Sequence, residues 1–253
     1  MNVVVEGLMV NYQKAGRGKE KVVCLPGWGD DLSSFAGLTD SLKDKFTVIS
    51  LDLPGFGGTQ TPASAWGLDN YANFVAQWLK KLKINQPYAI VGHSFGGSVA
   101  IDSLSSGKIK SKKLILLASA GIRNKQPARK KMLKAAAKTG KASLYFLPAT
   151  SRRKLRGRFY RAIGSDSHLV PHMEDTFRQI ITQDISAKAA RLKLPALLVY
   201  GSRDKSTPIE DGWVLSQLIE GSKLEIIEAG HFLHQTNTQE VAGLITNFLK
   251  AKS

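Results

Sequence analysis

One short segment of the chain has the residue types and spacing of a nucleophilic turn. The sequence Gly92-His93-Ser94-Phe95-Gly96-Gly97 follows the apolar run 88–91 and precedes a stretch with helical periodicity. A serine hydroxyl attacks a carbonyl only when a base removes its proton and a sharp turn exposes it. Glycines two positions before and after the serine permit such a turn. We therefore predict Ser94 as a nucleophile; the alternative is a glycine-rich turn with an incidental serine.

The elements that would position this serine follow from the hydrophobic pattern. Short runs with strand character alternate with amphipathic stretches, which is typical of an α/β fold with a mostly parallel sheet flanked by helices. We expect eight strands, at residues 3–6, 9–14, 21–25, 46–51, 88–92, 113–118, 196–200 and 223–227. The clearest helices are expected at about 70–83, 95–106, 210–220 and 237–250. Ser94 thus lies where a strand passes into a helix.

The alternation of strand-like runs with amphipathic stretches stops after residue 120. Pro127, Ser151 and Pro171 can each begin a helix, and apolar residues recur between them at helical spacing. The pattern predicts one core made of residues 1–120 and 187–253, with residues 121–186 inserted as a helical cap, or lid.

Nearly all of the net charge falls within this insertion. The chain carries a formal charge of +16, and residues 121–165 hold 14 of its 36 Lys and Arg residues and no acidic residue. The plainest interpretation is a solvated helical face. The alternatives are attraction of an anionic substrate, peripheral contact with an anionic membrane surface, and, ranked last for want of a nucleic-acid motif, nucleic-acid binding.

With these features together, the whole chain resembles the α/β-hydrolase superfamily. That resemblance implies an α/β-hydrolase fold and a triad in the order nucleophile, acid, histidine, each on a loop after a strand. The segment 201–208 is similar to the family's G-x-x-D-x-x-x-P acid loop and points to Asp204. The segment Ala229-Gly230-His231-Phe232 is similar to its G-H-F loop and points to His231. The family would assign Ser94, Asp204 and His231 as catalytic residues.

Other residues compete for two of these roles. His93 and His234 are the rival histidines, but the first points away from Ser94 in a tight turn and the second belongs to the following helix. Glu210 and Asp211 are the rival acids, and their place at a helix start suits a cap or a dipole partner.

The family resemblance also implies an oxyanion hole of backbone N–H groups, from the residue after the nucleophile and from the loop after the third strand. These would be Phe95 and Trp28. The loop 24–29 resembles the family's H-G-W/F-x segment, but Pro26 replaces the histidine found in many members. Because the donor is a main-chain group, we expect the hole to survive this change.

Two further positions of the family pattern bear on structure and on reaction type. The segment 51–57 resembles its D-x-P-G-x-G turn, where we interpret Asp52 as a hydrogen-bond acceptor that orders the loop. Dehalogenases and epoxide hydrolases of this fold attack with an aspartate. A serine at the turn excludes both.

Composition sets the remaining expectations. The only cysteine is Cys24, so an intrachain disulfide is impossible, and the N-terminus lacks a signal-peptide pattern. We expect a soluble cytoplasmic enzyme without metal or cofactor. It would hydrolyse a small-molecule carboxylic ester or thioester through an acyl-enzyme, as a carboxylesterase-type hydrolase. The alternatives are carbon–carbon bond hydrolysis of diketones with the same triad, and a non-catalytic basic binding module.

Overall fold

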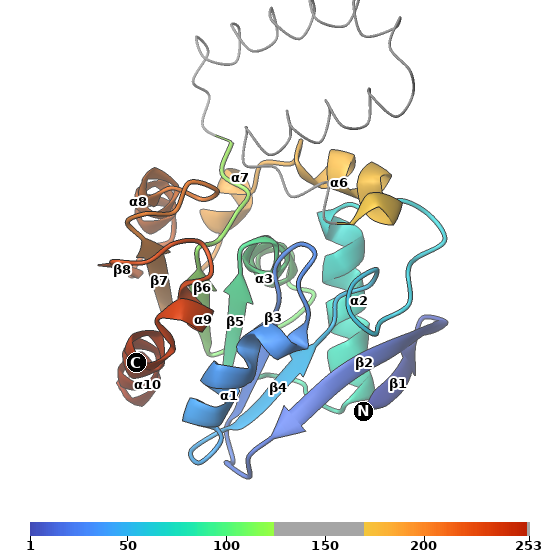
Figure 1. The fold of residues 1–253 in the computed structure, drawn as a ribbon, viewed down its shortest axis with the longest axis horizontal. Helices are drawn as coiled ribbons and strands as arrows, with labels where there is room; N and C mark the ends of the chain where they lie inside the picture. Colours follow the sequence, from blue (N-terminus) through green and yellow to red (C-terminus); the bar gives the residue numbers. More distant parts are fainter. Residues whose placement is uncertain (124–169, 252–253) are drawn as a thin grey trace, which may run out of the picture.

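An eight-stranded sheet forms the centre of the molecule (Figure 1). The computed structural model describes residues 1–123 and 170–251, so the cap helices predicted from Pro127 and Ser151 lie outside the described residues. The strand order is β1-β2-β4-β3-β5-β6-β7-β8, antiparallel in the first two pairings and parallel in the others. The strands are β1 (Asn2–Val5), β2 (Leu8–Ala15), β3 (Lys21–Leu25), β4 (Thr47–Leu51), β5 (Ala89–His93), β6 (Lys113–Leu117), β7 (Ala196–Gly201) and β8 (Lys223–Ile227).

Alternation along the buried strands divides the core into two parts. In β3, Val23 and Leu25 pack into one apolar cluster, whereas Val22 and Cys24 pack into the other. Successive side chains of a strand point to opposite faces, so a continuously apolar strand must be covered on both sides. The apolar runs of the sequence therefore correspond to strands between two helical layers.

Helices supply those two layers (Figure 1). Residues of α2, α3, α7 and α8 join the first cluster, and residues of α1, α9 and α10 join the second. The helices are η1 (Leu32–Phe35), α1 (Ala36–Leu42), α2 (Leu68–Lys81), α3 (Phe95–Ser105), η3 (Pro171–Met173), α6 (Glu174–Ile180), α7 (Ser186–Ala189), α8 (Ile209–Leu218), α9 (Leu233–Thr236) and α10 (Thr238–Lys250).

The sequence pattern placed every predicted strand within about two residues of its observed position, and the expected helix start at Pro171 is confirmed. It missed α1. This helix contains Gly37, Thr39 and Ser41, which have weak helix propensity. Its formation depends on burying Leu38 and Leu42 against the sheet.

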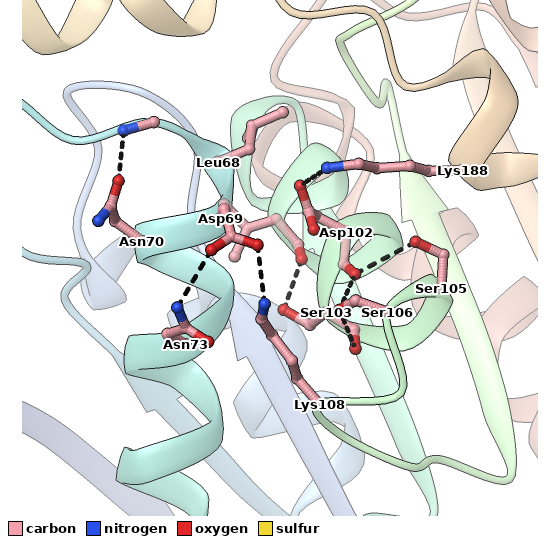
Figure 2. Close-up of polar contacts among 12 residues, drawn as sticks. Leu68, Asp69, Asn70, Asn73, Asp102, Ser103, Ser105, Ser106, Lys108 and Lys188 are labelled. Carbon is pink, nitrogen blue, oxygen red and sulfur yellow. Dashed lines mark hydrogen bonds and ion pairs between the residues drawn. The ribbon is translucent and has the colours of Figure 1, made fainter.

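Polar contacts join the helices of the first layer. Figure 2 shows the Asp102 carboxylate of α3 paired with Lys188 of α7, and Asp69 of α2 paired with Lys108. Asp102 is fully buried, whereas the side chain of Asp69 is 63% exposed. The Asp102–Lys188 pair therefore holds α7 against α3, the helix that follows Ser94, and its carboxylate is shielded from water.

Candidate active site

Ser94 lies in a strained turn between β5 and α3. Its φ of 47° and ψ of −113° are unusual for a residue with a side chain. The turn is held by main-chain bonds, because the Ser94 N–H donates to the Leu117 carbonyl at 3.0 Å and its own carbonyl accepts from Ala120 N–H at 3.1 Å. This is the backbone conformation expected of a nucleophile at the end of a strand. The expected exposure is not seen, because Ser94 is buried, with 7% of its surface exposed.

The glycines of this turn permit close backbone approach. A Cβ on Gly96 would lie 2.1 Å from the Leu25 carbonyl oxygen, and one on Gly92 would lie 2.6 Å from the Gly97 Cα. No side chain fits at either position, which is the physical reason for the motif.

Asp204 and His231 meet at the ends of two neighbouring strands. The acid follows β7 and the histidine follows β8, and the His231 Nδ1 lies 2.7 Å from the Asp204 Oδ2. A carboxylate can only accept, so Nδ1 carries the proton and Nε2 keeps its lone pair. The His231 side chain is 12% exposed, whereas that of Asp204 is fully buried. The arrangement provides an oriented base.

Asp204 remains ionised despite its burial. Burial alone would raise its pKa, but hydrogen bonds from His231 and Thr207 hold the pKa of Asp204 below its usual value. Ser206 and Thr207 donate main-chain N–H groups to its Oδ1 at 2.7 and 3.1 Å, and the Thr207 hydroxyl lies 2.7 Å from its Oδ2. Sequence analysis gave Thr207 no role. The Asx turn that Asp204 makes with the Ser206 N–H, two residues on, could have indicated an ordered loop but not the Thr207 hydroxyl.

Ser94 forms no hydrogen bond with His231 among the residues that the structure describes. Both lie beside His93, whose ring centroid is 4.9 Å from that of His231. Catalytic hydrogen bonds often form only when substrate binds, so the lack of this bond is compatible with a serine–histidine pair. The structure thus brings Asp204 and His231 into direct contact, and Ser94 directly follows His93, whose ring lies against His231.

The rival histidines are buried and neutral. Burial holds the pKa of His93 well below its usual value, and its Nε2 lies 3.0 Å from the His231 carbonyl oxygen. Burial lowers the pKa of His234 to about 3. Neither ring contacts a carboxylate in the way that His231 contacts Asp204, within the described ranges.

The rival acids lie in the first turn of α8, as expected. Burial raises the pKa of Asp211 to about 6, with further contributions from Glu210 and Asp204, while Arg123 opposes the shift. Neither rival carboxylate hydrogen-bonds to a histidine in the described part of the chain.

Trp28 and Phe95 lie side by side. Their rings pack edge to face at 5.5 Å, and Phe95 is the first residue of α3. The first N–H groups of a helix have no partner within it, and neither Phe95 N–H nor Trp28 N–H has an acceptor in the parts of the chain described here. Two main-chain donors are therefore available near Ser94.

Aromatic side chains surround this pair of donors. The Trp28 ring contacts Phe56 at 4.9 Å and Phe177 at 5.0 Å, and Phe177 belongs to α6. Figure 1 shows α6 beyond the carboxyl ends of the central strands, at the edge of the sheet where β5 ends and α3 begins. Sequence analysis did not foresee this contact, because residues 28 and 177 belong to different predicted units.

Two other residues have structural roles. Asp52 is buried and accepts from Asn11 Nδ2, Leu32 N–H and Gly58 N–H, each at 2.7 Å, which confirms its interpretation as a loop-ordering acceptor. Burial raises the pKa of the Cys24 thiol to about 12, so it cannot compete as a nucleophile.

The fold described above identifies the family of proteins to which the chain belongs. The chain belongs to the α/β-hydrolase fold family, whose model matches residues 21–238. Esterases and other hydrolases are among its relatives, so the protein is an α/β hydrolase. No helix in the described ranges has the length and apolar character needed to cross a membrane.

Individual relatives cover the chain to different extents. The chain is 28% identical to the pimeloyl-[acyl-carrier protein] methyl ester esterase of Chromobacterium violaceum, over 100% of both chains. It is 38% identical over 96 residues to the dihydrolipoyllysine-residue acetyltransferase component of the acetoin cleaving system of Cupriavidus necator, which is 38% of this chain and 25% of that protein. The structure of a meta-cleavage product hydrolase from Pseudomonas fluorescens IP01 has a TM-score of 0.74 at 20% identity, covering 98% of this chain and 96% of that one, and so shares the fold.

Proposed function

We propose that the protein hydrolyses a carboxylic ester or thioester with Ser94, His231 and Asp204 as its triad. The observation that carries this proposal is the 2.7 Å contact between His231 Nδ1 and a buried, ionised Asp204. That contact fixes the tautomer in which His231 Nε2 can accept the Ser94 proton.

The reaction would run in two steps. In the first, Ser94 Oγ attacks the carbonyl carbon while His231 takes its proton, and the proton then passes to the leaving alcohol or thiol. In the second, water attacks the acyl-enzyme with His231 again as base, which releases the acid and restores Ser94. The Trp28 and Phe95 N–H groups would hold the oxyanion in both steps, because they lack other acceptors among the described residues.

Three features bear on the substrate. The aromatic side chains of Trp28, Phe56 and Phe177 favour an apolar acyl group beside the donors. The full-length relative named for a methyl ester carried on acyl-carrier protein supports ester hydrolysis. The basic segment 121–165, part of the proposed cap 121–186, favours a substrate or carrier with negative charge.

A fluorophosphonate probe and a series of p-nitrophenyl esters test the proposal. The wild type should acquire one phosphonate at Ser94 and hydrolyse the esters, whereas Ser94→Ala should do neither. Ser105→Ala is the matched control because it alters the last serine of α3, whose hydroxyl bonds only to the Asp102 carbonyl among the described residues, and it should behave as wild type.

The other outcomes separate the alternatives. Labelling at Ser94 without ester turnover, together with cleavage of a 1,3-diketone, would favour carbon–carbon bond hydrolysis. A wild type that neither reacts with the probe nor turns over any ester would contradict the enzyme assignment and favour a binding module.

A further inference from the structure

Three polar side chains beside the triad are brought together by the fold and have no role in the proposed reaction. Asp30 lies in the loop after β3, His93 ends β5 and His234 lies in α9. One metal-ligating atom from each of these residues lies within 4.8 Å of those of the other two. They come from three segments far apart in the sequence, so only the tertiary structure assembles them.

Atoms of all three residues lack hydrogen-bond partners. The Asp30 Oδ2, the His93 Nδ1 and both ring nitrogens of His234 are buried without a partner among the described residues. His93 and His234 are each 1% exposed. Leaving a buried polar atom unpaired costs about 1–3 kcal/mol, so several of them at one point indicate a ligand rather than chance packing.

The hydrogen bond that His93 makes through its Nε2 leaves its Nδ1 available to bind a metal. A carbonyl oxygen can only accept, so the 3.0 Å contact with the His231 carbonyl requires the proton on the His93 Nε2. The Nδ1 lone pair is then free. A histidine that binds a metal with one nitrogen and donates the other N–H to a carbonyl is the usual arrangement in metal sites.

The space next to that nitrogen is kept open by a glycine. A Cβ on Gly27 would lie 2.9 Å from the His93 Nδ1, so a side chain there would crowd the ligand atom. In a tetrahedral zinc site with bonds of about 2.0–2.2 Å, the ligand atoms lie roughly 3.3–3.5 Å apart. Binding an ion would therefore require the side chains of Asp30 and His234 to rotate and draw the ligand atoms closer than the 4.8 Å that now encloses them.

We propose that Asp30, His93 and His234 bind one divalent transition-metal ion of the zinc class, with water as a fourth ligand. Two imidazoles and a carboxylate suit zinc better than magnesium or calcium, which prefer all-oxygen sites. The ion would join the loop that carries Trp28, the turn that carries Ser94 and the segment after His231. Its role is structural, and the ester chemistry of the triad needs no metal.

The test uses the full chain without a histidine tag, stripped with a chelator and titrated with Zn²⁺ in equilibrium dialysis. One ion should bind per chain, and the unfolding temperature should rise with zinc concentration, since a ligand of the folded state stabilises it. Cobalt(II) in place of zinc should give the visible absorption of a tetrahedral centre. Asp30→Asn and His234→Phe should each weaken zinc binding by roughly 100-fold or more, because each removes one ligand.

Matched variants identify the site. Asp31→Asn changes the adjacent carboxylate, which caps η1, and His172→Gln changes a histidine outside the cluster, so both should bind zinc as wild type does. Zinc binding that survives in Asp30→Asn and His234→Phe but disappears in His231→Gln would place the ion at the triad and overturn the proposal. Absence of a bound ion in the wild type would also overturn it. Either result leaves Ser94 labelling unaffected, so this proposal can fail independently of the proposed function.

Discussion

The orientation of His231 depends on a single carboxylate. Asp204 is fully buried and holds Nδ1 at 2.7 Å, so its replacement by asparagine would favour the wrong tautomer without changing the shape of the side chain. We expect Asp204→Asn to lower kcat for a p-nitrophenyl ester by about 10³- to 10⁴-fold with little change in KM.

Asp211→Asn is the matched control for that prediction. Its carboxylate lies in α8 and makes no hydrogen bond to a histidine in the described ranges, so kcat should stay within about threefold of wild type. Steady-state kinetics of the two variants decide the assignment. An equal loss in both would show that Asp204 is not the orienting acid.

Asp211 itself should make stability depend on pH. Its pKa of about 6 in the folded protein exceeds the usual 3.8 mainly because of burial. The folded state then holds its proton more tightly than the unfolded state, so the free energy of unfolding falls as pH rises from about 4 to 6. Above pH 6 the carboxylate is ionised in both states, and the full loss in the free energy of unfolding remains.

Asp211→Asn removes the free-energy cost of burying an ionised carboxylate at this position. Two pKa units correspond to about 3 kcal/mol, but solvent reaches this partly exposed carboxyl, so we expect the variant to gain roughly 1 kcal/mol at pH 7 and nothing at pH 4. Urea unfolding at both pH values measures the difference. Glu210→Gln alters the exposed neighbour and should show no comparable pH dependence; a constant gain for Asp211→Asn at both values would refute the burial explanation.

At the scale of elements, the pair of the buried Asp102 carboxylate and the partly exposed Lys188 links α3 to α7 (Figure 2). Replacing Lys188 with methionine would leave a desolvated carboxylate without its partner, and breaking such pairs typically costs 3–5 kcal/mol. Since the Lys188 side chain is 36% exposed, we expect a loss of about 3 kcal/mol in the free energy of unfolding. Urea denaturation measures it.

The neighbouring pair in Figure 2 provides the comparison. Asp69 is largely exposed, so Lys108→Met should cost less than about 1 kcal/mol. The double variant Asp102→Asn with Lys188→Met should recover part of the loss, because it removes the unpaired charge. Similar costs for both single lysine variants would mean that burial does not decide the strength of the Asp102 pair.

At the scale of the whole molecule, the charge is unevenly distributed. The formal net charge is +16, and 14 of the basic residues fall between residues 121 and 165. A positive field raises the local concentration of anionic substrates and is screened by salt. We expect kcat/KM for a p-nitrophenyl hemisuccinate to fall about three- to tenfold between 20 and 500 mM NaCl.

The neutral p-nitrophenyl butyrate is the matched substrate, with the same leaving group and a similar chain length. Its kcat/KM should change by less than about twofold over the same salt range. Equal salt dependence for both esters would instead assign the basic residues to a solvated surface.

Local patterns in the sequence determined much of this molecule. The strands and the turn around Ser94 could be predicted, because each depends on residues within a few positions of one another. The glycines around Ser94 show why: a backbone approach of 2.1 Å from a Cβ position admits no other residue. The assignment of the triad stays a prediction of the sequence and its family resemblance.

Contacts between distant segments were decided only by the tertiary structure. Strand β3 lies between β4 and β5, which brings the loop of Trp28 and Asp30 next to Ser94 and His93. The same packing places Phe177 on Trp28 and His234 beside His93, at ring distances of 5.0 and 4.3 Å. The periodicity of apolar residues predicts which face of an element is buried, but not which element covers that face. The strand order and the cluster of Asp30, His93 and His234 therefore could not be predicted from the sequence.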